Sequence, residues 1–364
     1  MSYIPSSNHR PLRDRRNNQK LIIHKEPFAG GGYGSIFKCE YNGEHLVAKK
    51  IPLAKDGFVD QPFEPLIMGC NIPFINKYRD VVFEDDYMYI IQNTGRSMKE
   101  YRRYDIPAYD DSLRWFAMLL TALKYLHRFN IVHLDIKPDN TLIFGHEIHL
   151  SDLGLASIVQ GDYERHVGTA SYRPPEVWAN QAKTTKSDVW SLGLTMYHLV
   201  NGEDLFSSSF SDKAMRNAEY RRMMDSWARD YTDGNKKTFH MNPKYPLAQV
   251  IYSMLHPNPN LRPSCSQLLK NPIFKTTTIP KKHPRKITIK RTPETLHVDW
   301  IYALLEDKFA TPKQGYEFSR WFINKNFNGH HISPSDFDIK MYHLLERRLI
   351  SNTSYIPKTT SDTS

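Results

Sequence analysis

A ten-residue run in the middle of the chain limits its possible fold and chemistry more than any other feature. The run reads Ile-Val-His-Leu-Asp-Ile-Lys-Pro-Asp-Asn over residues 131–140, and an Asp-Leu-Gly sequence begins twelve residues later, at Asp152. Carboxylate and amide oxygens are ligands that Mg²⁺ accepts, and a lysine ammonium binds phosphate. Because a single Asp in a loop is far more often a turn or cap residue, the run needs support from the rest of the sequence.

Five further motifs supply that support. A glycine-rich run and a lysine-bearing strand precede the central run, and motifs containing Pro-Pro-Glu, Asp-Val-Trp and Arg-Pro follow it; they occupy residues 28–36, 47–50, 168–176, 187–193 and 258–263. Each motif alone has an ordinary explanation as a flexible loop, a solvated strand edge or a helix start. Together, in this order across residues 28–274, the six elements resemble the catalytic domain of the eukaryotic protein kinases.

Hydrophobic periodicity predicts two regions of different secondary structure. Short β-rich runs separated by turn residues recur between residues 21 and 94, whereas residues 113–129 and 189–200 carry apolar side chains at helical spacing. With the resemblance, these patterns predict an α+β, bilobal, kinase-like fold. A small β-rich N-lobe is expected over residues 21–94 and a larger helical C-lobe over residues 95–274.

The rest of the chain is expected to flank this domain. We interpret residues 1–20 as a basic disordered segment, 275–291 as a basic linker, 292–350 as a helical C-terminal extension and 351–364 as a disordered tail. The net charge is +10, and residues 275–291 alone contribute +7. A solvated linker explains this charge. Nuclear targeting, or contact of residues 275–291 with nucleic acid or another anionic surface, is the alternative.

The chain shows no sign of export. Its three cysteines have no spacing typical of a disulfide framework or a zinc site, which favours a reducing compartment. The N-terminal residues lack the apolar region of a signal peptide, and no run of about 18 apolar residues occurs. We therefore expect a soluble intracellular protein, cytoplasmic, nuclear or both, without a membrane span.

A glycine-rich turn suits a phosphate-binding loop because backbone N–H groups can approach phosphate oxygens where no Cβ interferes. By resemblance, Gly31 and Gly34 take the second and third glycine positions of the kinase loop, and Ala29 stands in place of the first. This substitution is a departure from the family. The resemblance assigns further nucleotide contacts to Gly30, Gly32, Tyr33, Ile36, Ala48, Glu64 and Gln92.

Two adjacent lysines compete for the nucleotide phosphates. Because side chains on a strand alternate with period two, Ala48 and Lys50 share one face and Lys49 lies on the other. We predict that Lys50 contacts the α- and β-phosphates, with Lys49 as the alternative. Glu64 is the expected ion-pair partner of that lysine, and an acid favoured at a helix start is the other interpretation.

The resemblance assigns the catalytic roles in the large lobe. Asp135 would orient the substrate hydroxyl and accept its proton, and Lys137 would neutralise the transferred phosphoryl group. Asn140 and Asp152 would bind Mg²⁺, with ATP as the phosphoryl donor. Lys137 and Thr169 are typical of the serine/threonine branch, in which the threonine contacts the catalytic Asp and Lys.

Three further residues are assigned structural roles by the same resemblance. Glu176 and Arg262 match a buried ion pair that ties the activation segment to the large lobe. Asp188 matches the helix residue that braces the catalytic loop. Removing one partner of such a pair leaves a buried charge uncompensated, which costs about 3–5 kcal/mol.

Two further positions, besides Ala29, depart from the family. Leu134 replaces the arginine that in most kinases binds a phosphate on the activation loop, and residues 155–167 contain only Ser157 and Tyr163 as phosphate acceptors. We therefore expect activity without loop phosphorylation. Leu153 replaces the usual Phe, and with Leu134 it resembles the Wee-type kinases.

The sequence therefore predicts an ATP- and Mg²⁺-dependent serine/threonine protein kinase acting on protein hydroxyls. A tyrosine or dual-specificity kinase of the Wee type is one alternative. A pseudokinase or scaffold that uses the fold and the basic flanks for partner binding is the other. A degenerate scaffold would be expected to lack one of the four central residues, and all of them are present: Lys50, Asp135, Asn140 and Asp152.

Overall fold

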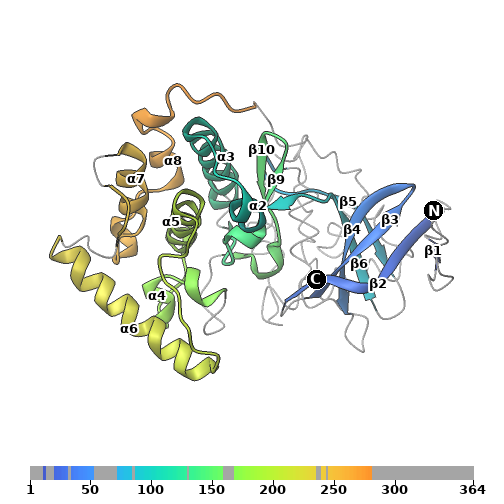
Figure 1. Ribbon diagram of the computed structural model, residues 1–364, viewed down its shortest axis with the longest axis horizontal. Coiled ribbons are helices and arrows are strands. Elements are labelled where there is room, and N and C mark those ends of the chain that lie inside the picture. The colour runs from blue at the N-terminus through green and yellow to red at the C-terminus, as the bar shows by residue number, and fades with distance from the viewer. Residues whose placement is uncertain are drawn as a thin grey trace, which may run out of the picture. The chain divides into compact units, whose positions relative to one another are not determined.

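The computed structural model describes residues 11–13, 20–31, 34–52, 72–83, 87–128, 131–158, 168–234, 239–242 and 245–280. These residues form two compact units (Figure 1). One contains the described residues up to 52 together with 76–94, and the other contains 72–75 and 95–280. The first is a β-sheet and the second is mainly helical, which confirms the predicted kinase-like α+β fold. The predicted extension 292–350, the tail 351–364 and most of the basic linker lie outside the described residues.

The first unit is a six-stranded antiparallel sheet with the order β1-β2-β3-β4-β6-β5. Its strands are β1 (Pro11–Arg13), β2 (Lys20–Gly31), β3 (Gly34–Tyr41), β4 (Glu44–Pro52), β5 (Tyr78–Phe83) and β6 (Tyr87–Gln92). Strand β1 corrects one expectation, because residues 11–13 belong to the segment predicted to be disordered. The polar composition of that segment gave no sign that its backbone pairs with the start of β2.

Strands β3 and β4 form a tight hairpin that fixes the register of the sheet. Asn42 and Gly43 connect them with positive φ angles of 53° and 83°, as a two-residue type I′ turn requires. One face of the resulting sheet carries a buried cluster, which consists of Leu21, Cys39, Tyr41, Leu46, Ala48, Tyr89 and Ile91. Burial raises the pKa of the Cys39 thiol to about 11. The hairpin therefore decides which residues of β4 face this cluster.

The second unit is built around helix α5 (Thr185–Asn201). A capping box between Thr184 and Ser187 begins this helix, and Gly202 ends it with a φ of 83°. Every residue of α5 from Ser187 to Leu199 is buried, as the apolar pattern predicted. The other helices of the unit are α2 (Met98–Tyr104), α3 (Tyr109–Arg128), α4 (Pro175–Trp178), α6 (Lys213–Thr232), α7 (Pro246–Met254) and α8 (Cys265–Leu268). Within the described residues, none of the helices is long and apolar enough to cross a bilayer.

Two small sheets in the second unit flank the loops that contain the central run and the Asp-Leu-Gly sequence. One has the order β10-β9-β7 and contains β7 (Arg96–Ser97), β9 (Thr141–Phe144) and β10 (Glu147–Leu150). The other pairs β8 (Ile131–Val132) with β11 (Ser157–Ile158). The segment 72–75 joins this unit through the Leu150 N–H, which donates to the Phe74 carbonyl at 2.9 Å. The residues between β8 and β9 therefore form a loop that is anchored at both ends.

Candidate active site

The loop between β8 and β9 contains a compact polar cluster centred on Asp135. Asp135 Oδ1 accepts hydrogen bonds from the Thr169 backbone N–H and hydroxyl, at 2.9 and 2.8 Å. Asp135 Oδ2 lies 2.9 Å from Lys137 Nζ and accepts from Asn140 Nδ2 at 2.9 Å. Lys137 also donates to the Thr169 hydroxyl at 2.7 Å. The contacts predicted for Thr169 are thus present, and the Asp135 carboxylate is held at both oxygens.

Asp188 of helix α5 fixes the backbone just before Asp135. Its side chain is fully buried, and its two oxygens accept the backbone N–H groups of His133 at 2.8 Å and Leu134 at 3.0 Å. Leu134 has a φ of 66°, a left-handed conformation that costs a bulky residue of the order of 1–3 kcal/mol. The buried carboxylate offsets this strain by binding the N–H of the strained residue. The bracing role predicted for Asp188 therefore corresponds to two hydrogen bonds.

Gly168 brings the activation segment against this loop. Its φ is 80°, and a Cβ at this position would lie 2.4 Å from the Leu134 carbonyl oxygen. No side chain fits in that space, so residue 168 must be glycine for Thr169 to reach Asp135. Arg173 Nη2 donates to the Gly168 carbonyl at 2.7 Å, and burial lowers the pKa of Arg173 to about 10.

The predicted metal ligands come from neighbouring segments of the second unit. The Asn140 side-chain nitrogen is used by Asp135, so the amide oxygen is the atom of Asn140 that can bind a cation. Ser151 N–H donates to the Asn140 carbonyl at 2.8 Å, which places Asp152 one residue from this contact. Asp152 has a left-handed backbone, with φ 59° and ψ 72°.

These donors fit Mg²⁺ better than a transition metal. Mg²⁺ is usually bound by one or two carboxylates together with phosphates and water. Asn140 and Asp152 supply two oxygen donors of the required kind. Over the described residues, no group of three or more His, Cys, Asp or Glu side chains is placed to hold a metal ion.

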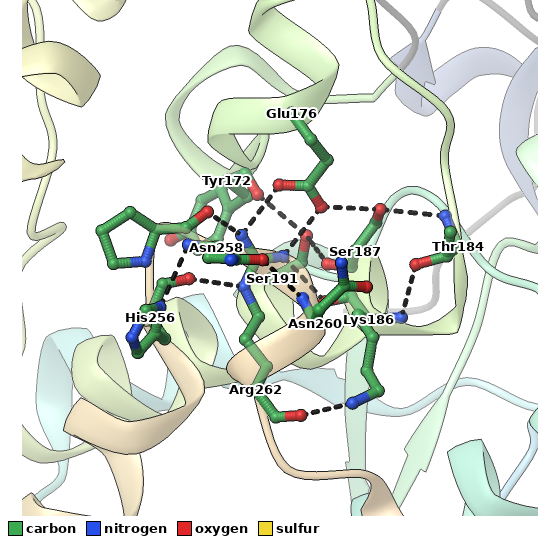
Figure 2. A network of polar contacts seen from close by, with 11 residues as sticks. Tyr172, Glu176, Thr184, Lys186, Ser187, Ser191, His256, Asn258, Asn260 and Arg262 are labelled. Carbon is green, nitrogen blue, oxygen red and sulfur yellow. Dashed lines mark hydrogen bonds and ion pairs between the residues drawn. The ribbon is translucent and has the colours of Figure 1, made fainter.

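Figure 2 shows the network that fixes the end of the activation segment. Arg262 binds both oxygens of Glu176, at 2.7 and 2.8 Å, and both side chains are nearly fully buried. The same guanidinium donates to the carbonyls of His256, Lys186 and Pro257, at 2.7, 3.0 and 3.1 Å. The buried ion pair predicted from the sequence is present, and its guanidinium also binds three backbone carbonyls.

The glycine-rich run includes the end of β2 and the start of β3, a region called the glycine turn below. Gly30 pairs with Ser35 and Gly31 pairs with Gly34, and Gly32 and Tyr33 lie outside the described residues. Gly34 has a φ of 135°, and a Cβ there would lie 2.7 Å from the Lys50 carbonyl oxygen. Only glycine therefore allows β3 to approach β4 this closely.

The two lysines of β4 lie in different environments. Lys49 pairs with Ile36 of β3, is only 5% exposed, and its side-chain carbons lie 3.7 Å from a Cβ built on Gly34. Lys50 lies on the face of the buried cluster, where its ammonium is 3.6 Å from the centroid of the Tyr87 ring. The lysine beside the glycine turn is therefore Lys49, which reverses the order of preference given by the sequence.

The remaining predicted nucleotide contacts do not all lie together. Ile36 and Ala48 lie on opposite faces of the sheet, because Ile36 pairs with Lys49 whereas Ala48 pairs with Phe37 and belongs to the buried cluster. The prediction that both contact the nucleotide is inconsistent with this register. Gln92 shares the Lys49 face, and its side chain accepts a hydrogen bond from Asn76 at 3.1 Å. Glu64 lies outside the described residues, and of Ala29 only the backbone pairing is described.

Three residues that support the site were not predicted. Ser187 donates to Glu176 at 2.9 Å, and His127 lies 2.9 Å from Asp188. Cys265 lies 3.7 Å from the other ring nitrogen of His127. Each contact joins residues at least 11 positions apart, so no local pattern in the sequence could have shown it.

Comparison with known families agrees with this geometry. Residues 24–274, more than two thirds of the chain, match the model of the protein kinase domain. The chain therefore belongs to the protein kinase domain family, which confirms the predicted resemblance.

Several relatives are named serine/threonine-protein kinases. Nek6 of Oryza sativa subsp. japonica is 31% identical over 261 residues, which cover 68% of this chain and 46% of the relative. The polo kinase of Drosophila melanogaster is 28% identical, covering 72% of this chain and 46% of the relative, and dst2 of Dictyostelium discoideum is 28% identical, covering 73% and 24%. The chain thus spans less than half the length of each of these relatives.

A solved kinase domain has the same fold. Its crystal structure superposes with a TM-score of 0.58 at 21% sequence identity, covering 71% of this chain and 96% of that domain.

Proposed function

We propose that this chain is an ATP- and Mg²⁺-dependent serine/threonine protein kinase. The observation that carries the proposal is the cluster in which Asp135 contacts Lys137, Asn140 and Thr169. A carboxylate held at both oxygens can orient a substrate hydroxyl and accept its proton, and the adjacent ammonium can stabilise charge on the transferred phosphoryl group. Asn140 and Asp152 would hold Mg²⁺, which neutralises phosphate charge when bound.

The proposed acceptor is serine or threonine rather than tyrosine. Lys137 and Thr169 are the residues that support this assignment, and the named relatives support it independently. Protein substrates follow from the same family. We further propose an intracellular location, on the basis of three cysteines whose spacing is not typical of a disulfide framework.

Phosphoamino-acid analysis tests the proposed reaction. The full chain is incubated with γ-labelled ATP, MgCl₂ and a panel of generic protein substrates, and phosphoserine or phosphothreonine is expected. EDTA should abolish the transfer, because the proposed donor set binds the nucleotide through Mg²⁺. Predominant phosphotyrosine would favour the Wee-type alternative, and no transfer to any substrate would favour a scaffold.

We expect Lys49→Met to reduce phosphoryl transfer strongly and Lys50→Met to reduce it little. Lys49 lies beside the glycine turn, whereas the ammonium of Lys50 lies over the Tyr87 ring on the opposite face. Losing a cation that stabilises transition-state charge typically costs about 100-fold to 1000-fold in kcat. The two variants are matched in sequence and chemistry, so comparing kcat and ATP affinity in both decides between them. A strong loss of phosphoryl transfer in Lys50→Met, with little loss in Lys49→Met, would instead support Lys50, the lysine preferred from the sequence.

We also propose that activity does not depend on activation-loop phosphorylation, because Leu134 replaces the arginine that would bind a loop phosphate. Replacing Ser157 with Ala and Tyr163 with Phe together is expected to change kcat by less than about tenfold, or roughly 1.4 kcal/mol of barrier. The assay uses protein produced in a host without other eukaryotic-type kinases. A larger loss, or activation by an added upstream kinase, would show that loop phosphorylation controls the enzyme.

A further inference from the structure

Three polar side chains form a buried chain behind the catalytic loop. Cys265 Sγ of helix α8 lies 3.7 Å from His127 Nδ1 of α3, and His127 Nε2 lies 2.9 Å from Asp188 Oδ2 of α5. Cys265 is 2% exposed and Asp188 is fully buried, while the His127 side chain is 11% exposed. The chain ends at the carboxylate that binds the N–H groups of His133 and Leu134, directly before Asp135.

Both ring nitrogens of His127 have a partner. Nε2 faces the Asp188 carboxylate, which accepts a hydrogen bond, and Nδ1 faces the Cys265 sulfur, which can accept one from the charged ring or donate one to the neutral ring. Burial opposes the charge on the ring, but Cys265 and Asp188 outweigh it and raise the pKa of His127 to about 10. The charged His127 ring then faces the Asp188 carboxylate as a buried counter-charge and helps to hold it in place.

Of the two groups that contact the His127 ring, Cys265 is the one that can be replaced without removing a side chain that binds the catalytic loop directly. Asp188 of α5 is committed to two backbone N–H groups, so it cannot be replaced without releasing the loop. Lys186, at the start of α5, interacts electrostatically with Cys265 and donates to the Arg262 carbonyl. The His133 ring points to the Ser151 carbonyl at 3.2 Å rather than to His127. Cys265 is therefore the second group, besides Asp188, that directly contacts the His127 ring.

We propose that Cys265 is a positioning residue for phosphoryl transfer, acting through His127 on Asp188 and the catalytic loop. Without the sulfur, Nδ1 of His127 has no hydrogen-bonding partner among the described residues, so burial favours the neutral ring. A neutral ring no longer compensates the Asp188 carboxylate, and the strained Leu134 backbone is held less firmly. The consequence for catalysis rests on the proposed kinase function. The consequence for the protonation of His127 does not.

The first experiment measures that protonation directly. The full chain is labelled with ¹³C-histidine, and the ring signals are followed by NMR from pH 6 to pH 11, with His127→Gln used to assign His127. In the wild type the His127 signal is expected to titrate near pH 10. Cys265→Ala should lower that pKa by at least about one unit, whereas Cys265→Ser keeps a hydrogen-bonding atom and should lower it by less. Cys39→Ala is the matched control, because Cys39 is also buried but lies in the other unit.

The second experiment follows stability and activity in the same proteins. A raised pKa contributes stability that is fully present below the ordinary value of 6.5 and is lost as pH rises through about 10. In Cys265→Ala this loss should begin at lower pH, and the alkaline limb of kcat should move with it while KM for ATP stays unchanged. Cys265→Val provides a second apolar replacement if the alanine variant does not fold.

An unchanged His127 pKa in Cys265→Ala or Cys265→Val would overturn the proposal. Equal shifts in Cys265→Ala and Cys39→Ala would also overturn it, since they would reflect general loosening. If His127 shifts as expected in a protein that shows no kinase activity, the link to His127 stands and the proposed function fails.

Discussion

Replacing Asp135 with Asn is expected to lower kcat by about 100-fold to 10,000-fold while the protein remains folded. The amide is nearly isosteric and can still accept from Thr169, but it cannot take a proton from a substrate hydroxyl. It also removes the negative charge that faces Lys137 at 2.9 Å. Steady-state kinetics and a thermal unfolding curve, measured on the same preparation, check both parts of this expectation.

Asp139→Asn is the matched control for this change. Asp139 lies in the same loop, but it is 45% exposed and pairs with Lys99 rather than with the central cluster. We expect its kcat to stay within about tenfold of the wild type, as exposed ion pairs contribute little. Activity close to the wild type in Asp135→Asn would exclude the proposed role of Asp135 and with it the kinase mechanism.

The second large effect concerns stability. Glu176→Ala is expected to lower the free energy of unfolding by about 3–5 kcal/mol, because it leaves the Arg262 guanidinium buried without a counter-charge. The two side chains are 2% and 0% exposed, so water cannot replace the lost carboxylate. Urea unfolding followed by tryptophan fluorescence measures this change, and Trp190 reports on it directly, since its ring lies 4.9 Å from the guanidinium.

An exposed ion pair in the same unit provides the comparison. Asp111 pairs with Arg114 on α3, with both side chains more than one third exposed. Asp111→Ala should cost no more than about 1 kcal/mol. Similar losses in the two variants would mean that the Glu176 pair contributes no more than a surface contact, contrary to its burial.

The contacts predicted from the sequence were those between residues that belong to motifs of the kinase family. Thr169 and Asp135 are 34 residues apart, and Glu176 and Arg262 are 86 apart, yet both contacts were expected because each residue sits in a recognisable motif. The strands between residues 21 and 94 and the helices α3 and α5 were predicted because alternation and helical spacing are local properties.

Contacts that depend on tertiary packing could not be predicted in this way. Alternation showed that Lys49 and Lys50 face opposite sides of β4, but only the pairing with Ile36 shows which side adjoins the glycine turn. Cys265 and His127 are 138 residues apart, and neither sits in a pattern that points to the other. Strand β1 was missed because an edge strand is held by backbone pairing, which leaves little trace in composition.

The Glu176–Arg262 contact has a consequence for the order in which the protein becomes functional during synthesis. Ribosomes add about 5–20 residues per second, so the 86 residues between the two partners take roughly 4–17 s to make. During that interval the catalytic loop already exists, but the guanidinium that closes the activation segment does not. The activation segment can therefore take its final form only after Arg262 has been translated, so the proposed kinase activity cannot be complete before that point.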